Sequence, residues 1–308
     1  MDSIRQTIGK ALEALVGQDS SVIALTADLA SSVGMVPIRE KHPKQFIQCG
    51  IAEQEMMSLS AGLALSGSKP FCGSFAAFNP GRNWDQLRNS VCYNHAPVRV
   101  ISSHYGLSVG GDGATHQCLE YLALTLPLPN LDVLIPFNNS SALYSMNFAY
   151  SQNNRATVIF QPRESHTESI ENVQDNNLIN NGFSNYKSQK GEAETLIISA
   201  GLISSEVFKL EEDQESKPVD FVFLVNLTGL NIPKLTNHIK KYLKILIVEE
   251  HQEFGGIASL IYQILVANKI AIDGAHICLR KEFGHSAANG QELWKKYGLD
   301  VDTIKKYI

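Results

Sequence analysis

The sequence predicts a two-domain α/β protein, in which each domain has a mostly parallel β-sheet with helices on both faces. Three observations predict this class. Short β-branched runs alternate with longer helical patterns, which is typical of parallel sheets joined by crossover helices. The alternation lapses once, in a polar stretch, and then restarts. The 308 residues, 44% of them hydrophobic, are enough for two buried cores.

The first half of the chain contains apolar runs of strand length, each followed by an amphipathic pattern of helical period. An N-terminal helix leads into "SVIALTA", and "KPFCGSF" is the next strand-like run. We expect strands at 21–27, 69–75, 97–102 and 131–136, and helices near 4–16, 53–66, 82–94 and 139–151.

A stretch rich in Asn, Ser and Glu separates this half from the second one. After it, we expect strands at 195–200, 219–225, 244–250 and 275–279, with helical stretches between them. The predicted organisation is therefore a first domain at 1–170, a linker at 171–192 and a second domain at 193–308.

Composition narrows the class of function. The net charge of −5 and the lack of a basic stripe argue against nucleic acid as a partner. No apolar run is long enough to cross a bilayer, and the N-terminus lacks the pattern of a signal peptide. The five cysteines have no C-x-x-C pair, as expected of buried thiols in a reducing compartment. We therefore expect a cytoplasmic protein with no membrane partner.

The segment "GIAEQEMMSLSAGLALSG" places Glu53 and Glu55 in the first turn of a predicted helix. Acids in a first turn are favoured by the helix dipole and by the unpaired N–H groups. Alternatively, one of the two acids is placed to contact a basic group of a ligand. The helix alone does not decide between these readings.

The segment "SSHYGLSVGGDGATHQ" places His104, Asp112 and His116 in a glycine-rich loop that follows a predicted strand. We expect the next helix to open near Thr115. Ligands of open α/β sheets bind at the carboxyl ends of the strands, so the loop is a candidate site. The glycines could instead serve only tight turning. The interval between the two histidines matches no compact metal-ligand spacing.

Phe75 and Phe78 directly follow another predicted strand. Paired aromatic residues at such a place are commonly part of the core. They could also form an apolar platform for a heteroaromatic ring. The nearby Glu53 helix and the histidine loop favour the platform.

Taken together, "GIAEQEMM", "PFCGSFAAF", "GRNWDQLRNSV", "SHYGLSVGGDGATHQ", "VEEHQEFGG" and "EFGHSAANGQELWKKYGLD" occur in an order that resembles the carboxyl-terminal half of transketolases. The resemblance is strongest to the separate C-terminal subunit of transketolases that are split into two polypeptides. It covers nearly the whole chain and implies a thiamine diphosphate-binding pyrimidine domain followed by the transketolase C-terminal domain.

The resemblance implies that Glu53 contacts ring nitrogen N1′ of the cofactor's aminopyrimidine. A carboxyl group there favours the imino tautomer, whose nitrogen can accept the proton from C2 of the thiazolium ring. Burial beside aromatic rings would help to keep this acid protonated. By the same resemblance Phe75 and Phe78 pack against the pyrimidine, and Glu55 is an ordinary first-turn acid.

The implied reaction moves a two-carbon ketol unit from a ketose to an aldose. His104 matches a position near the sugar phosphate, His116 one near the reacting carbons, and Asp112 one that contacts a substrate hydroxyl. The implied catalytic residues are thus Glu53, His104 and His116. A further set matches positions at the sugar or its phosphate, where a planar guanidinium suits phosphate oxygens: Arg5, Asp28, Ser32 and Arg163.

The sequence departs from the family at two motifs. The common "VGEDG" reads Val109 to Gly113 as "VGGDG", and the usual "FGESG" or "FGASG" reads Phe283 to Ala287 as "FGHSA". A tyrosine common after the paired aromatics is also replaced around Gly81-Arg82. These departures concern the identity of the sugars more than the cofactor chemistry.

We expect this chain to lack the family's magnesium and diphosphate motif, a "GDG" followed after an interval by "NN". The oxygen ligands of Mg²⁺ would then come from a separate N-terminal subunit. An assembly of two copies of each subunit, with active sites between chains, is the natural expectation.

Two other readings remain open at this point. The beta subunit of a 2-oxo acid dehydrogenase shares the two-domain architecture and an activating glutamate, although the loop "SVGGDGATHQ" favours transketolase. A non-catalytic partner subunit would tolerate loss of Glu53 and of the aromatic pair, and this chain has kept both.

Overall fold

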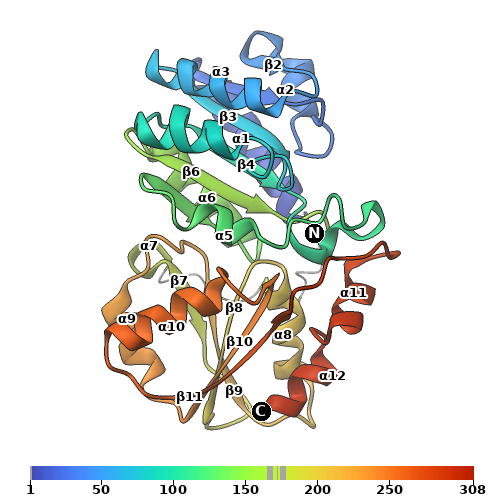
Figure 1. Cartoon of the computed structure of the whole chain (residues 1–308), viewed down its shortest axis with the longest axis vertical. Helices are drawn as coiled ribbons and strands as arrows, with labels where there is room; N and C mark the ends of the chain where they lie inside the picture. Colours follow the sequence, from blue (N-terminus) through green and yellow to red (C-terminus); the bar gives the residue numbers. More distant parts are fainter. Residues whose placement is uncertain (1, 165–168, 172, 174–177) are drawn as a thin grey trace.

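The computed structural model describes residues 2–164, 169–171, 173 and 178–308. Two α/β domains are stacked along the long axis of the molecule, with the first half of the chain above the second half in Figure 1. Each domain is built on its own sheet with helices around it. The predicted fold class is therefore confirmed.

The first sheet is entirely parallel. Its strands lie in the spatial order β2 (Phe46–Gln48), β1 (Val22–Thr26), β3 (Lys69–Phe75), β4 (Arg99–Ser103), β6 (Ala156–Gln161) and β5 (Leu131–Leu134). Because parallel strands point the same way, their carboxyl ends all meet at one edge of the sheet. This edge carries the candidate site.

One face of the first sheet is covered by α1 (Ile4–Gln18) and α6 (Asn139–Ser151). Helix α1 begins with a capping box at Ser3 and buries Ile4, Ile8 and Leu12, which recur at the helical period. The remaining helical segments of this domain are α2 (Val36–Lys41), α3 (Glu53–Leu65), α4 (Trp84–Gln86), a π-helical turn at Leu87–Tyr93, and α5 (Tyr121–Thr125).

The second sheet is parallel except for one edge strand. Its spatial order is β11 (Asp273–Leu279), β10 (Lys244–Gln252), β8 (Thr195–Ala200), β9 (Val219–Leu224) and β7 (Phe183–Tyr186), and β7 runs antiparallel to β9. Its helices are α7 (Leu178–Asn181), α8 (Ile203–Glu212), α9 (Ile232–Ile239), α10 (Ile257–Ala267), α11 (Gly290–Tyr297) and α12 (Val301–Ile304).

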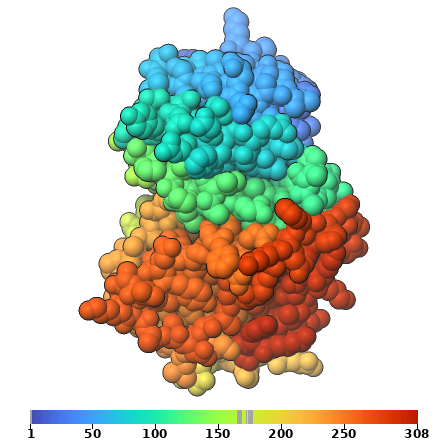
Figure 2. Space-filling view, viewed as in Figure 1, coloured from blue at the N-terminus to red at the C-terminus, as the bar shows by residue number. Residues whose placement is uncertain are grey.

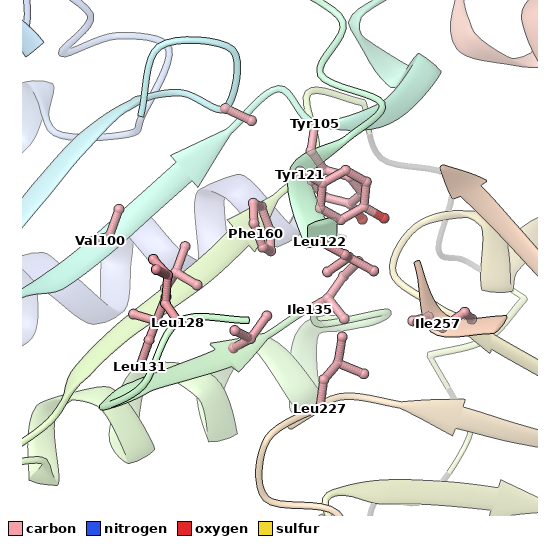
Figure 3. Close-up of a cluster of buried hydrophobic side chains, with 14 of the residues drawn as sticks. Val100, Tyr105, Tyr121, Leu122, Leu128, Leu131, Ile135, Phe160, Leu227 and Ile257 are labelled. Atoms are coloured by element: carbon pink, nitrogen blue, oxygen red, sulfur yellow. The ribbon is translucent and has the colours of Figure 1, made fainter. Parts of the chain in front are cut away.

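The two domains share a hydrophobic core. The cluster in Figure 3 joins Leu122 and Ile135 of the first domain to Leu227 and Ile257 of the second. The Ile135 backbone N–H donates to the Val225 carbonyl at 2.9 Å, which extends the contact into the backbone. This continuity fixes the orientation of one domain on the other.

The structure differs from the predicted elements at several strands and helices, including α2 (Val36–Lys41), which was not predicted. Strands β2, β6 and β7 were not predicted, and β7 and α7 lie within the range 171–192 that was predicted as linker. Residues 172 and 174–177 of that range lie outside the described part. The helix expected near Thr115 is wrong, because Gly106–Asp112 forms a 3₁₀ segment and α5 begins only at Tyr121.

Within the described ranges, no helix is both long enough and apolar enough to cross a bilayer.

Candidate active site

Four neighbouring strands bring most of the predicted site residues to one edge of the first sheet. The carboxyl ends of β1, β3, β4 and β6, with the loops that follow them, carry these residues in turn, and the four strands are adjacent in the sheet. In chain order the residues are Asp28 and Ser32, then Phe75 and Phe78, then His104, Asp112 and His116, and finally Arg163.

Glu53 is the first residue of α3, and its side chain is only 2% exposed. Its carboxylate accepts a hydrogen bond from the Ser74 hydroxyl at 3.4 Å, and its backbone carbonyl accepts one from Asn83 Nδ2 at 3.0 Å. By contrast, Glu55 is exposed. Glu53 is therefore held inside the protein, where an ordinary first-turn acid would face water.

Arg82 is the charged partner of Glu53. Its Nη1 lies 2.7 Å from Glu53 Oε2, and its guanidinium carbon lies 4.4 Å from the centre of the Phe78 ring. The Arg82 side chain is 47% exposed, so the counter-charge approaches the buried carboxylate from the solvent side. Sequence reasoning noted Arg82 only as a departure and missed this contact.

The Phe75 and Phe78 rings are stacked, with centroids 6.2 Å apart and 20° between their planes. Neither ring belongs to the three clusters of buried apolar side chains that form the core. Their ring neighbours are instead His104, 3.8 Å from Phe75, and His116, 5.3 Å from Phe78. The phenylalanine pair therefore lies beside the two histidines of the candidate site.

The imidazole ring of His104 stacks on the Phe75 ring. His104 is 3% exposed, and its backbone adopts a φ of 59°, a left-handed conformation that is uncommon outside glycine. Burial, aided by the positive charges of Arg163 and Arg5, lowers its pKa to about 3. His104 is therefore a neutral imidazole at physiological pH, with Nδ1 2.7 Å from the Ser103 hydroxyl.

The arginine at the end of β6 reaches the glycine-rich loop. Arg163 Nη1 lies 3.3 Å from Asp112 Oδ2 and also donates to the Val109 carbonyl. His116 stands on the same loop with its Nδ1 2.9 Å from the Thr115 hydroxyl. Arg5, near the start of α1, contributes with Arg163 to the lowered pKa of His104.

Asp28 and Ser32 are less closely joined to the rest. The exposed Asp28, with φ 60°, receives Gln48 Nε2 at 3.2 Å and donates its own N–H to Gln48 Oε1 at 2.7 Å. Ser32 is half-buried in the same loop. Among the described contacts, none connects these two residues to the histidines or to Glu53, so they stand at the edge of the site.

The expectation that the chain lacks a "GDG" followed by "NN" is wrong. Gly111-Asp112-Gly113 is followed by Asn138-Asn139 at an interval in the range of that motif. The structure gives these residues other partners: Asp112 pairs with Arg163, and Asn138 is buried as the N-cap of α6. In the described residues, no group of three or more His, Cys, Asp and Glu side chains is arranged to hold a metal ion.

Glu250 also escaped sequence reasoning, although it supports the loop. It lies on β10 and is 1% exposed, and its Oε1 accepts the Leu107 N–H at 3.0 Å and Trp294 Nε1 at 2.7 Å. Burial raises its pKa to about 7. Two consecutive acids inside the apolar run "KILIVEEHQ" were the available signal.

The site therefore combines a buried carboxylate, a stacked aromatic wall, two histidines and two arginines at the carboxyl edge of a parallel sheet. Residues 2–168 match the family model described as transketolase, pyrimidine binding domain. Because this match covers more than half of the chain, the chain belongs to the transketolase family. Proteins of this family use thiamine diphosphate.

Similar proteins of two lengths are known. A protein of Methanocaldococcus jannaschii, named provisionally as a transketolase C-terminal section, is 28% identical over 99% of this chain and 95% of its own length. One subunit of the apulose-4-phosphate transketolase of Phocaeicola vulgatus is 26% identical over 99% of this chain and 96% of its own. The 1-deoxy-D-xylulose-5-phosphate synthase of Alkaliphilus oremlandii is 27% identical, but this chain spans only 49% of it.

Solved structures agree with these relatives. A split-gene transketolase described as an inactive beta4 tetramer matches 99% of this chain and 96% of its own, with a TM-score of 0.82 and 25% identity. The transketolase of Leishmania mexicana shares the fold at the same TM-score, and this chain covers 44% of it. The chain is thus a transketolase-type C-terminal unit.

The residues present fit the pyrimidine of thiamine diphosphate. A flat ring needs an apolar surface beside a hydrogen-bonding group; Phe75 is 7% exposed and stacks on Phe78, and Arg82 contacts both the Phe78 ring and the buried Glu53 carboxylate. The chain's own atoms therefore offer both kinds of contact in one place.

Proposed function

We propose that this chain is the C-terminal subunit of a two-component, thiamine diphosphate-dependent transketolase. It would act with a separate N-terminal subunit to move a two-carbon ketol unit from a ketose phosphate to an aldose. The observation that carries the proposal is the buried Glu53 carboxylate beside the phenylalanine pair, on the same sheet edge as the two histidines. Two similar proteins, of which this chain covers 95% and 96%, are named as a section or a subunit of a transketolase.

Thiamine diphosphate, when bound, supplies the carbon nucleophile and the electron sink for cleavage of the bond beside the ketose carbonyl. In our proposal Glu53 holds the aminopyrimidine ring nitrogen through its carboxyl group. Phe75 and Phe78 exclude water from one face of that ring. The ion pair between Arg82 and Glu53 must break for this contact to form, because the Arg82 guanidinium is bound to Glu53 Oε2 and lies over the Phe78 ring.

The histidine loop is assigned to the sugar. His104, neutral because its pKa is about 3, can donate or accept a hydrogen bond without carrying a charge. We assign to the half-buried His116 the exchange of protons with substrate oxygens. Arg5 and Arg163 supply the positive charge that a sugar phosphate needs, and Asp112 accepts a sugar hydroxyl. We also assign Asp28 and Ser32 to the sugar, at the outer edge of the candidate site.

We assign Mg²⁺ and the diphosphate to the partner subunit, in an assembly of two copies of each chain. This assignment rests on the family resemblance and on the two relatives named as a transketolase section or subunit, of which this chain covers 95% and 96%. The proposed domains are 1–170 and 193–308, the second extended to include β7 (Phe183–Tyr186), which pairs with β9.

The test is reconstitution. The chain should co-purify with an N-terminal transketolase subunit when the two are expressed together, and the pair should consume a ketose phosphate in a screen of donors and aldose acceptors. Turnover of a 2-oxo acid in place of the ketose would favour the dehydrogenase beta subunit. Calorimetry on the chain alone should detect no tight, magnesium-dependent binding of thiamine diphosphate, and tight binding would contradict the partner-held diphosphate.

A further inference from the structure

A segment of the second domain lies against the glycine-rich loop of the first. We call residues 106–117 the substrate-facing loop and residues 283–290 the clasp segment. Ser286 Oγ donates to the Gly111 carbonyl at 2.7 Å, and Gln117 Nε2 donates to the His285 carbonyl at 2.8 Å. In Figure 1 the chain before α11 runs up beside the loop that follows β4. The contact also shows in Figure 2, where red C-terminal atoms border green ones.

The approach of the two segments is close. A Cβ on Gly290 would come within 3.0 Å of Ser108 Cα, and a Cβ on Gly284 would lie 1.7 Å from Gln117 Oε1. The Gly290 N–H, at the start of α11, donates to both Glu164 oxygens at 3.1 Å. Glycine at 284 and 290 therefore lets the clasp segment reach the loop.

The second domain holds both ends of the substrate-facing loop. At its start, Glu250 Oε1 accepts the Leu107 N–H while it also receives Trp294 Nε1 from α11. At its end, the buried Gln117 is bound to the clasp segment. Asp112 and His116 both lie between these two anchors, Leu107 and Gln117. Their positions therefore depend on a domain that contributes none of the predicted site residues.

The two segments are also where the sequence departs from the family. Gly111 stands where the motif "VGEDG" has glutamate, and His285 and Ala287 replace residues of "FGESG", whose serine is kept as Ser286. The hydrogen bond between the segments joins the retained Ser286 to the backbone carbonyl of Gly111, 175 residues away in the chain. The departures at Gly111, His285 and Ala287 thus flank a contact between the two domains.

We propose that the clasp segment positions the substrate-facing loop, and that Ser286 and Gln117 are positioning residues for sugar recognition. This inference rests on the proposed function, since it concerns the same site. Neither residue is assigned a contact with substrate or cofactor. Each acts through the loop that carries Asp112 and His116.

The first experiment does not depend on catalysis. Amide hydrogen exchange of residues 106–117 is measured in the full chain for wild type, Ser286→Ala and Gln117→Leu. Loss of one hydrogen bond should speed exchange of these amides about fivefold, the factor that corresponds to about 1 kcal/mol. Ser286→Thr, which keeps the hydroxyl, should restore protection. Ser151→Ala is the matched control, because the exposed Ser151 hydroxyl also donates to a carbonyl, that of Phe148 at 2.7 Å, but on α6.

The second experiment separates positioning from mere packing. In the reconstituted assembly, Ser286→Ala and Gln117→Leu should raise KM for the sugar phosphate about three- to tenfold, with exchange of the cofactor C2 proton unchanged. Unchanged loop protection, or raised loop exchange with an unchanged KM, would overturn the inference. If the wild-type assembly has no ketol-transfer activity, the proposed function fails, and titration of a pentose 5-phosphate into the same variants decides the inference by binding alone.

Discussion

Glu250→Gln should make the protein more stable at pH 8 than the wild type. The carboxyl group is buried between the two domains, and burial raises its pKa from 4.5 to about 7. The folded protein therefore binds this proton more tightly than the unfolded chain does. The stabilising effect of protonation is fully present below pH 4.5 and is lost as the pH rises towards 7.

The size of the effect follows from the two pKa values. Each pKa unit corresponds to about 1.4 kcal/mol, so the wild type should lose about 3 kcal/mol of unfolding free energy between pH 4.5 and pH 7 from this group. A glutamine carries no titrating proton, and its Oε1 can still accept from Leu107 N–H and Trp294 Nε1. The stability of the variant relative to the wild type should therefore rise by about 3 kcal/mol between pH 4.5 and pH 8.

The assay is urea unfolding at pH 4.5, 6 and 8, followed by circular dichroism. Glu212→Gln is the control, because Glu212 is exposed near the end of α8 and should shift stability by less than about 0.5 kcal/mol at every pH. A Glu250→Gln protein that is less stable than the wild type at pH 8, or that differs from it equally at all three pH values, would refute the reasoning.

Three further predictions follow from the site. Arg82→Met removes the only counter-charge that contacts the buried Glu53 carboxylate among the described residues. Urea unfolding should show a loss of about 1 to 3 kcal/mol in unfolding free energy, less than for a fully buried pair because the Arg82 side chain is 47% exposed. An equal loss in the control Arg88→Met, an exposed arginine of the next turn, would contradict a specific role for Arg82. Arg5→Ala or Arg163→Ala should raise KM for phosphorylated sugars and leave cofactor affinity nearly unchanged, and equally easy use of unphosphorylated sugars by the wild type would count against this assignment. The pKa of His104, about 3, lies below the value of 6.5 in the unfolded chain, so the contribution of neutral His104 to stability is present above pH 6.5 and is lost as the pH falls towards 3. The imidazole NMR signals of His104 should therefore not titrate between pH 5 and 8. A titration step in that range would show that the side chain is not buried as described.

Long apolar runs made most of the fold predictable. The strand expected at 69–75 is observed at Lys69–Phe75, and the helix expected at 139–151 at Asn139–Ser151. Strand β2 was missed because it has three residues, none of them buried. Strand β7 was missed because it lies in a polar stretch at the edge of its sheet, where Asn185 is exposed to solvent.

Long-range contacts in the site could not be predicted from the sequence. Local patterns identified Glu53, Phe75, Phe78 and the histidine loop, since each follows a strand or opens a helix. Nothing local indicates that Arg82 reaches back 29 residues to Glu53. The contacts of Glu250 likewise join segments far apart in the chain, and they depend on how the two sheets are docked.

The role of Glu53 is the central claim, and exchange of the cofactor C2 proton tests it most directly. Hydrogen–deuterium exchange at C2 of thiamine diphosphate is measured in the reconstituted assembly of the wild type, Glu53→Gln and the control Glu55→Gln, with thermal melting alongside. As a mere first-turn acid, Glu53 would contribute only about 0.3 to 1 kcal/mol of stability and nothing to exchange.

As the group that activates the cofactor, Glu53 should matter far more. Glu53→Gln should slow C2 exchange by roughly 10² to 10⁴, the range of general acid–base groups, in an assembly that still folds, while Glu55→Gln exchanges at the wild-type rate. Near-normal exchange in a folded, fully assembled Glu53→Gln protein would contradict the account.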